Sequence, residues 1–104
     1  MKKKRVPSEH QENAYLLRLY VTGSTPRSAR SIFNIRKLCE ERLLGHYKLE
    51  VVDIYQQPEM AREEQIIAAP TLIKKLPLPL RKLVGDLSDH ERVLVGLDLK
   101  PERK

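Results

Sequence analysis

The sequence predicts an α/β fold whose amino-terminal half is a βαβ unit. Residues 15–22 and 47–55 are apolar runs rich in β-branched and aromatic residues, which is typical of buried strands. Residues 27–43, between these runs, carry apolar side chains three and four positions apart, which is typical of a helix. A strand, a helix and a strand at this spacing form a parallel pair joined by a right-handed crossover.

The predicted helix has recognisable signals at both ends. Ser24 or Thr25 can cap its start, and Pro26 suits the first helical position. Gly45 is predicted to end the helix, because glycine is common just past the last helical residue. The buried face of the helix is expected to consist of Ile32, Ile35, Cys39 and Leu43.

The second half of the chain begins with a short helix, predicted from Pro58 to about Ile66. Ala69-Pro70-Thr71-Leu72 then leads into a third strand-like stretch, whose apolar residues are Leu72, Ile73 and Leu76. The sheet is therefore expected to contain at least three strands.

Two local signals disagree over residues 88–99. Ser88 and Glu91 have the spacing of a capping box, which predicts a helix that starts near Asp89. Gly96 costs a helix roughly 1 kcal/mol relative to alanine, and strict alternation predicts a strand through Val93, Val95, Leu97 and Leu99. Because neither signal prevails, this segment is a candidate for two alternative folds.

The charge distribution divides the chain into three parts. Residues 1–13 hold four basic and two acidic residues and are predicted to be a disordered basic arm. Residues 14–99 are predicted to form a single domain, and 100–104 a basic tail. Most of the net charge of +6 lies in the two tails, so binding of nucleic acid through a dedicated basic face is not expected.

The order of the predicted elements resembles thioredoxin, but the redox chemistry of that fold is missing. Ser24-Thr25-Pro26-Arg27 stands where thioredoxin carries two cysteines, although Pro70 matches the proline before its third strand. Cys39 is the single cysteine of the chain and is expected to be buried. Without a pair of thiols there is no disulfide exchange.

Other catalytic and metal-binding patterns are also absent from the sequence. The sequence contains no P-loop. The three histidines, His10, His46 and His90, are far apart in the sequence, and Glu63-Glu64 is predicted to be solvated surface. We therefore expect no enzyme activity, no cofactor and no metal. No apolar run approaches the roughly 20 residues of a membrane helix, so a cytoplasmic protein without a membrane partner is expected.

Four segments carry a resemblance to one known family. They are LRLYVTGSTPRSARS (17–31), LEVVDI (49–54), QPEMAREEQIIAAPTLIKKLP (57–77) and RKLVGDLSDHERVLVGLDL (81–99). Together they resemble KaiB over residues 15–99. The resemblance implies a non-enzymatic regulator that binds the N-terminal ATPase ring of a hexameric KaiC homologue. In the clock such a protein then captures KaiA and competes with the thioredoxin-like domain of the kinase SasA.

The resemblance also implies a change of fold in the carboxy-terminal half of the chain. KaiB proteins rest in a ground state that is a homo-oligomer, a tetramer or dimer, and switch slowly to a thioredoxin-like monomer; we expect the ground state for the isolated chain. The positions that it assigns to the switch are Gly96, Asp98, Pro70, Pro77 and Pro79. Those that it assigns to partner binding are Arg18, Arg30, Arg81, Lys82 and Asp98.

Three departures from the family leave alternatives open. The chain has Pro77-Leu78-Pro79 where three prolines are common, Glu50 and Gln65 where lysines are common, and a basic end at 100–104 where an acidic tail is usual. One alternative is a KaiB-like protein of stress adaptation that acts through a different partner, with KaiC binding weak or lost. A second is nucleic-acid binding through the basic tails.

Overall fold

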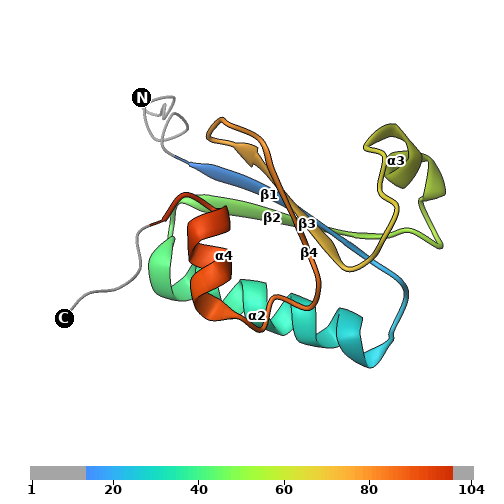
Figure 1. The fold of residues 1–104 in the computed structure, drawn as a ribbon, viewed down its shortest axis with the longest axis horizontal. Coiled ribbons are helices and arrows are strands. Elements are labelled where there is room, and N and C mark those ends of the chain that lie inside the picture. Colours follow the sequence, from blue (N-terminus) through green and yellow to red (C-terminus); the bar gives the residue numbers. More distant parts are fainter. Residues whose placement is uncertain (1–13, 100–104) are drawn as a thin grey trace, which may run out of the picture.

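The computed structural model describes residues 14–99, so the predicted arm at 1–13 and the predicted tail at 100–104 lie outside the described residues. Four strands form one sheet in the order β2-β1-β3-β4, and three helices pack on it (Figure 1). The elements in chain order are β1 (Tyr15–Val21), α2 (Pro26–Arg42), β2 (Tyr47–Asp53), α3 (Pro58–Glu63), β3 (Thr71–Leu76), β4 (Arg81–Val84) and α4 (His90–Gly96).

The predicted βαβ unit is confirmed. β1 and β2 are parallel and in register from the pair Tyr15 and Tyr47 to the pair Val21 and Asp53, with α2 as the crossover. β3 runs antiparallel to β1, and β4 antiparallel to β3. The sequence did not predict β4, whose four residues are too few to show a clear period.

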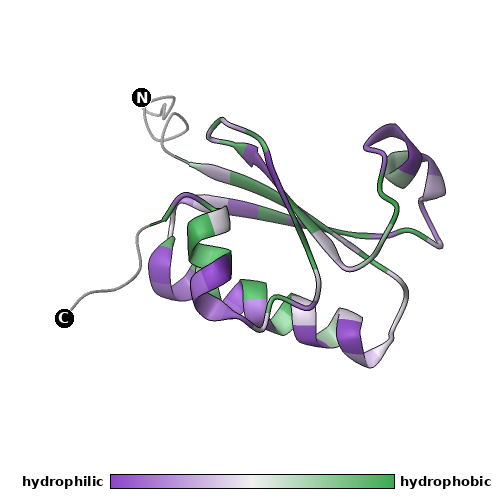
Figure 2. Ribbon diagram, viewed as in Figure 1, coloured by the Kyte–Doolittle hydropathy of each residue, from purple (hydrophilic) through white to green (hydrophobic). Residues whose placement is uncertain are grey.

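The sheet is covered unequally on its two faces. α2 and α4 lie on one face, whereas α3 lies over one end of the other (Figure 1). Hydrophobic residues follow the central strands, while hydrophobic and hydrophilic stretches alternate along α2 and α4 (Figure 2). The larger core, between the sheet and the two helices, includes Leu17, Leu19, Ile35, Leu72 and Leu94. The smaller core under α3 consists of Tyr20, Val52, Ala61 and Ile73.

The start of α2 follows the prediction, and its end differs slightly. Thr25 caps the helix, because its Oγ1 accepts a hydrogen bond from the backbone amide of Ser28 at 3.2 Å, and Pro26 is the first helical residue. The helix ends at Arg42, with Leu43 as its cap. Gly45 lies in the turn that follows, with φ of 79°, so it allows the reversal into β2 rather than ending the helix.

The disputed segment near the carboxyl end is helical. Asp89 caps α4, since its Oδ1 accepts from the backbone amide of Arg92 at 3.2 Å. The prediction of a helix starting near Asp89 is confirmed, but the capping residue is Asp89 and not Ser88. Val93, Leu94 and Leu97 are buried while Val95 is 62% exposed, a pattern that fits a helix and contradicts an alternating strand.

The helical α4 and the edge strand β4 together give the thioredoxin-like arrangement. The ground-state arrangement expected for the isolated chain is not the one in this structure. Packing of Val93, Leu94 and Leu97 into the larger core outweighs the strand preference of the valines and the helix penalty of Gly96.

Candidate functional site: two charged clusters

The residues that the resemblance assigned to partner binding fall in three places. Arg18 and Lys82 lie on the sheet face that carries α3, and both approach Glu64. Arg81 and Asp98 form an ion pair with a distance of 3.1 Å. Arg30, on α2, pairs at 3.3 Å with Asp86, in the loop before α4. The structure therefore brings together two pairs and leaves Arg30 apart from both.

The first charged cluster, here named the open-face cluster, consists of Arg18, Glu50, Glu64, Lys75 and Lys82. Arg18 and Glu50 face each other across the parallel pair β1 and β2, and Arg18 Nε lies 2.8 Å from Glu50 Oε1. Glu64, just after α3, accepts from Lys75 Nζ at 3.1 Å and lies 3.8 Å from Arg18. Lys82 Nζ donates to the backbone carbonyl of Glu64 at 2.9 Å.

Glu64 joins this cluster to the smaller core. The hydroxyl of Tyr20 lies 3.3 Å from both Glu64 Oε1 and the carbonyl of Met60. Burial raises the pKa of Tyr20, an effect that the hydrogen bond from Arg18 opposes. The hydrogen bond to Tyr20 is also the main reason that the pKa of Arg18 is raised. Arg18 is therefore a charged group with a fixed position.

The prediction that Glu63-Glu64 is solvated surface is wrong for Glu64. Its side chain is 22% exposed, and it links β1, β3 and β4 to α3. The sequence contained a weak signal for this role. Arg18, Lys75 and Lys82 are cations on one face of the sheet, and a carboxylate close to them gains favourable charge interactions.

The second cluster, here named the ion triad, consists of Lys74, Arg81 and Asp98. The side chain of Lys74 is fully buried, and its Nζ forms an ion pair with Asp98 Oδ2. Arg81 Nη2 pairs with Asp98 Oδ1 at 3.1 Å. Hydrogen bonds from Arg81 and then from Lys74 lower the pKa of the Asp98 carboxyl. The triad therefore connects β3 and β4 to the turn just after α4.

Lys74 was missed by the sequence analysis, although a signal existed. Alternation along Thr71–Leu76 places Lys74 on the same face as Leu72, which is a core residue. A lysine on a core face needs a buried or half-buried partner of opposite charge. Its partner is 24 positions away in the sequence, so the pairing itself was not predictable.

Gly96 and Asp98, assigned to the switch, both lie where α4 meets the sheet. A Cβ atom on Gly96 would lie 3.0 Å from Leu83 Cγ on β4 and closer still to its methyl groups, so a larger residue there requires the Leu83 side chain to move. Asp98 has a φ of 61°, which reverses the chain after the helix. The Tyr15 hydroxyl donates to the carbonyl of Leu97 at 3.1 Å and fixes the same turn to β1.

The three prolines assigned to the switch lie at the ends of β3. Pro70 is buried, follows a cis peptide bond, and its carbonyl accepts from the Gly85 amide at 2.9 Å. Pro77 and Pro79 lie in the turn between β3 and β4, also after cis peptide bonds. Leu76, at the end of β3, and Leu78 and Leu80, in the turn, are 45%, 74% and 50% exposed, so this end of the hairpin presents apolar side chains.

Residues 14–99 contain no group of three or more histidine, cysteine or acidic side chains placed to hold a metal ion. Within the same residues, no helix has both the length and the apolar character needed to cross a membrane.

Comparison with solved structures places this arrangement in the thioredoxin-like fold. The N-terminal domain of SasA from Synechococcus elongatus superposes with a TM-score of 0.68 at 18% identity, covering 100% of this chain and 97% of that domain. Mitochondrial thioredoxin 3 from Saccharomyces cerevisiae gives a TM-score of 0.67 at 16% identity, over 88% and 83% of the two chains.

Comparison with protein sequences identifies the family. The KaiB domain model matches residues 18–99. The circadian clock oscillator protein KaiB of a Synechococcus species is 53% identical over 85 residues, which are 82% of this chain and 77% of that protein. The circadian clock protein KaiB3 of a Synechocystis species is 49% identical over 90 residues, which are 86% and 88% of the two chains. The chain therefore belongs to the KaiB family.

Proposed function

We propose that this chain is a non-enzymatic clock regulator that binds the N-terminal ATPase ring of a hexameric KaiC homologue in its thioredoxin-like arrangement. The proposal rests on one observation: about half of the aligned residues are identical to those of proteins that are named circadian clock proteins. The family match covers residues 18–99, nearly all of the residues that the structure describes, so the relatives' clock role is the best-supported role for this protein.

The open-face cluster is the proposed contact surface. Lys82 is exposed and lies on an edge strand, and the part of this face that α3 leaves uncovered is accessible to a large partner (Figure 1). Arg18 and Lys75 are held in place by Glu50 and Glu64, so little side-chain entropy is lost when a partner binds. Cations at the rim of an interface increase the rate of association with an acidic surface.

Arg81, Asp98 and Arg30 have different proposed roles. Arg81 and Asp98 belong to the ion triad and would act by holding α4 and β4 in the binding-competent arrangement. Arg30 is half of an ion pair with Asp86 and would contribute a peripheral contact. In the ground state the same chain would form a tetramer or dimer in the cytoplasm.

Competition with a SasA-like kinase fits the fold comparison. The thioredoxin-like domain of SasA and this chain share one architecture, and two proteins of the same shape can occupy the same site on a third. KaiA would be a further partner in organisms that contain it.

A second candidate function is stress adaptation through a different partner. The observation in its favour is Glu50, which neutralises Arg18 at 2.8 Å and thereby reduces the basic character of the proposed contact surface. A ring with an acidic docking surface would then bind this chain weakly.

The deciding experiment is complex formation with the KaiC homologue of the same organism, followed for several hours by size-exclusion chromatography. We expect a complex that forms slowly and contains the N-terminal ring. The double variant Arg18→Ala/Lys82→Ala should bind at least about tenfold more weakly, a change of about 1.4 kcal/mol. The control Arg36→Ala/Lys37→Ala removes the same charge from the exposed side of α2 and should bind normally.

Absence of any complex at about 50 μM of each protein would contradict KaiC binding and favour the second candidate. Binding to nucleic acid that falls steeply with salt and is lost when residues 1–13 and 100–104 are deleted would instead support the nucleic-acid alternative.

A further inference from the structure

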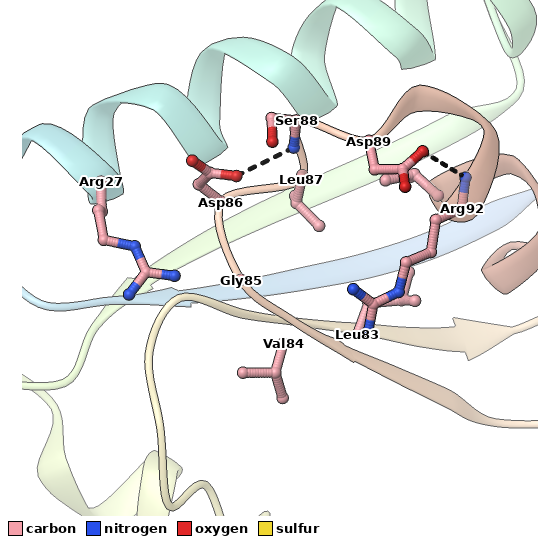
Figure 3. Close-up of a pocket in the computed structure, with 10 residues that line it drawn as sticks. Arg27, Leu83, Val84, Gly85, Asp86, Leu87, Ser88, Asp89 and Arg92 are labelled. Atoms are coloured by element: carbon pink, nitrogen blue, oxygen red, sulfur yellow. Dashed lines mark hydrogen bonds between the residues drawn. The ribbon is translucent and has the colours of Figure 1, made fainter.

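A pocket of about 290 Å³ lies at the end of β4 that leads into the loop before α4. It is formed where the first turn of α2, the end of β4 and the loop before α4 meet (Figure 3). Arg27 and Arg92 line it from the two helices, and Leu83, Val84 and Val93 supply apolar surface. No residue of the open-face cluster or of the ion triad lines this pocket.

The two carboxylates at the pocket are already occupied. Asp86 Oδ1 accepts from the Ser88 amide at 3.1 Å, and its Oδ2 accepts from Arg30 Nε at 3.3 Å. These hydrogen bonds, led by those from Ser88, lower the pKa of Asp86. Asp89 Oδ1 accepts from the Arg92 amide at 3.2 Å and caps α4. Figure 3 shows both carboxylates on the side of the pocket toward α2.

The two guanidinium groups are not occupied in this way. Within residues 14–99, neither Arg27 nor Arg92 has a carboxylate in ion-pair contact with its side chain, and both residues are exposed. Figure 3 shows the two side chains on opposite sides of Gly85, and both guanidinium groups point toward the side of the pocket on which Val84 lies. A carboxylate that enters the pocket would accept charge-assisted hydrogen bonds from a guanidinium group that no carboxylate within residues 14–99 holds.

The apolar surface of the pocket restricts the kind of ligand. Val84 is 55% exposed although it belongs to a strand, and Leu83 is only partly buried. An inorganic anion would satisfy the arginines and leave this surface in water, whereas an apolar group next to a carboxylate would cover it. A volume of about 290 Å³ is at the lower limit for small-molecule sites, which suits one or two side chains.

The neighbouring main chain indicates how such side chains would arrive. β4 is the edge strand of the sheet, so its outer amide and carbonyl groups are available to an added extended segment. We propose that this pocket binds an aspartate or glutamate side chain and its apolar neighbour, from an extended segment of a partner protein that lies along the end of β4. This site is independent of the partner proposed above.

The test is an NMR titration of the full chain, labelled with ¹⁵N, with the blocked peptide Gly-Leu-Asp-Leu-Gly. We expect saturable shifts of the Gly85 amide and of the Nε groups of Arg27 and Arg92. The analogue with asparagine in place of aspartate should bind about tenfold more weakly, because it lacks the charge. Free acetate and free phosphate are titrated alongside, to detect a site for simple anions.

The variant Arg27→Gln/Arg92→Gln should lose the shifts, while Arg36→Gln/Lys37→Gln, with the same loss of charge on exposed α2 positions, should keep them. The proposal is overturned by equal binding of the two peptides, or by binding that survives in Arg27→Gln/Arg92→Gln. It is also overturned if acetate or phosphate binds as tightly as the peptide, or if no shift occurs up to about 10 mM peptide, where even millimolar affinity approaches saturation.

Discussion

The ammonium group of Lys74, buried on β3, pairs with the carboxylate of Asp98, two residues beyond the end of α4. The two ends of this ion pair differ in their access to water, because the Lys74 side chain is fully buried and that of Asp98 is 34% exposed. Asp98 can therefore be hydrated when its partner is lost, whereas Lys74 cannot. This asymmetry makes the carboxyl-terminal helix dependent on one carboxylate.

The first prediction follows from this asymmetry. Lys74→Met keeps the volume of the side chain and leaves Asp98 paired with Arg81, so it should change the free energy of unfolding by no more than about 1 kcal/mol. Asp98→Asn leaves a buried ammonium without a counter-ion and should destabilise the chain more than Lys74→Met does. Urea titrations followed by far-UV circular dichroism measure both changes.

The double variant Lys74→Met/Asp98→Asn is the control for this pair. Because it has no buried charge left, it should be more stable than Asp98→Asn alone. If instead Lys74→Met were the more damaging single change, the packing of the lysine stem rather than its charge would dominate.

Acid should weaken the same contact. Hydrogen bonds from Arg81 and Lys74 lower the pKa of Asp98 below its ordinary value of 3.8, so the folded chain favours the ionised form. The resulting stabilisation is complete above that ordinary value and is lost as the pH falls below it toward the lowered pKa. Thermal melts between about pH 6 and about pH 2.5 should therefore show a falling midpoint in the acid range.

Asp86 contributes acid sensitivity of the same sign, since hydrogen bonds from Ser88 lower its pKa as well. In the variant Asp98→Asn the melting temperature should fall less steeply with decreasing pH than in the unmodified chain. The decrease that remains should be the contribution of Asp86. An unchanged decrease in Asp98→Asn would show that the ion triad does not respond to pH.

The close approach of Gly96 to Leu83 predicts a dependence between two substitutions. Gly96→Ala gains helix propensity of up to about 1 kcal/mol, but the new methyl group requires Leu83 to move. The gain should therefore be larger by about 0.5–1 kcal/mol in a Leu83→Ala background than in the unmodified chain. A double-mutant cycle of unfolding free energies measures this difference, and strict additivity would contradict the contact.

Glu64 and its neighbour Glu63 provide a matched pair for the open-face cluster. Glu64→Gln removes the charge that holds Lys75 and Arg18 and should cost about 0.5–1.5 kcal/mol of stability. Glu63→Gln, at an exposed position with the same change of charge, should cost less than about 0.5 kcal/mol. Chemical denaturation compares them directly; equal effects would mean that Glu64 has no special structural role.

Cys39 should be inert in the folded chain. Burial is the main reason that the pKa of its thiol is raised to about 12, so almost no thiolate exists near neutral pH. Iodoacetamide at about pH 8 should therefore label the folded chain only as fast as the core opens, and should label it rapidly in about 6 M urea. Rapid labelling without urea would indicate that this part of α2 opens locally.

The amino-terminal half was the more predictable part of the fold, because its signals are local. Thr25 and Pro26 start α2 within a few residues of the end of β1, and the apolar runs of β1 and β2 are long enough to identify without tertiary information. In the second half, β4 has only four residues, and α4 contains Gly96 and two valines, which oppose the helix that the capping signal predicts. The helix forms there because Val93, Leu94 and Leu97 find a core built by distant residues.

The candidate site was predictable as a set of residues but not as an arrangement. The basic character of Arg18, Arg81 and Lys82 is visible in the sequence, whereas their partners are far away in it. The carboxylates that pair with Arg18 and Arg81 are 46 and 17 positions away, and the backbone carbonyl that accepts from Lys82 is 18 positions away. Only the register of the strands and the position of α3 bring Glu64 to Arg18 and Asp98 to Arg81. Pairings of this kind depend on the completed sheet, and no local pattern encodes them.

The position of β1 in the sheet has a consequence for any other arrangement of this chain. β1 pairs with β2 on one side and with β3 on the other, and β3 belongs to the half that the resemblance assigns to the switch. If β3 leaves, the amides and carbonyls of β1 between Leu16 and Tyr20 lose their partners beside the core residues Leu17 and Leu19. Such an edge is a template for aggregation, so every alternative fold must offer β1 a replacement strand, either from the same chain or from a neighbouring copy.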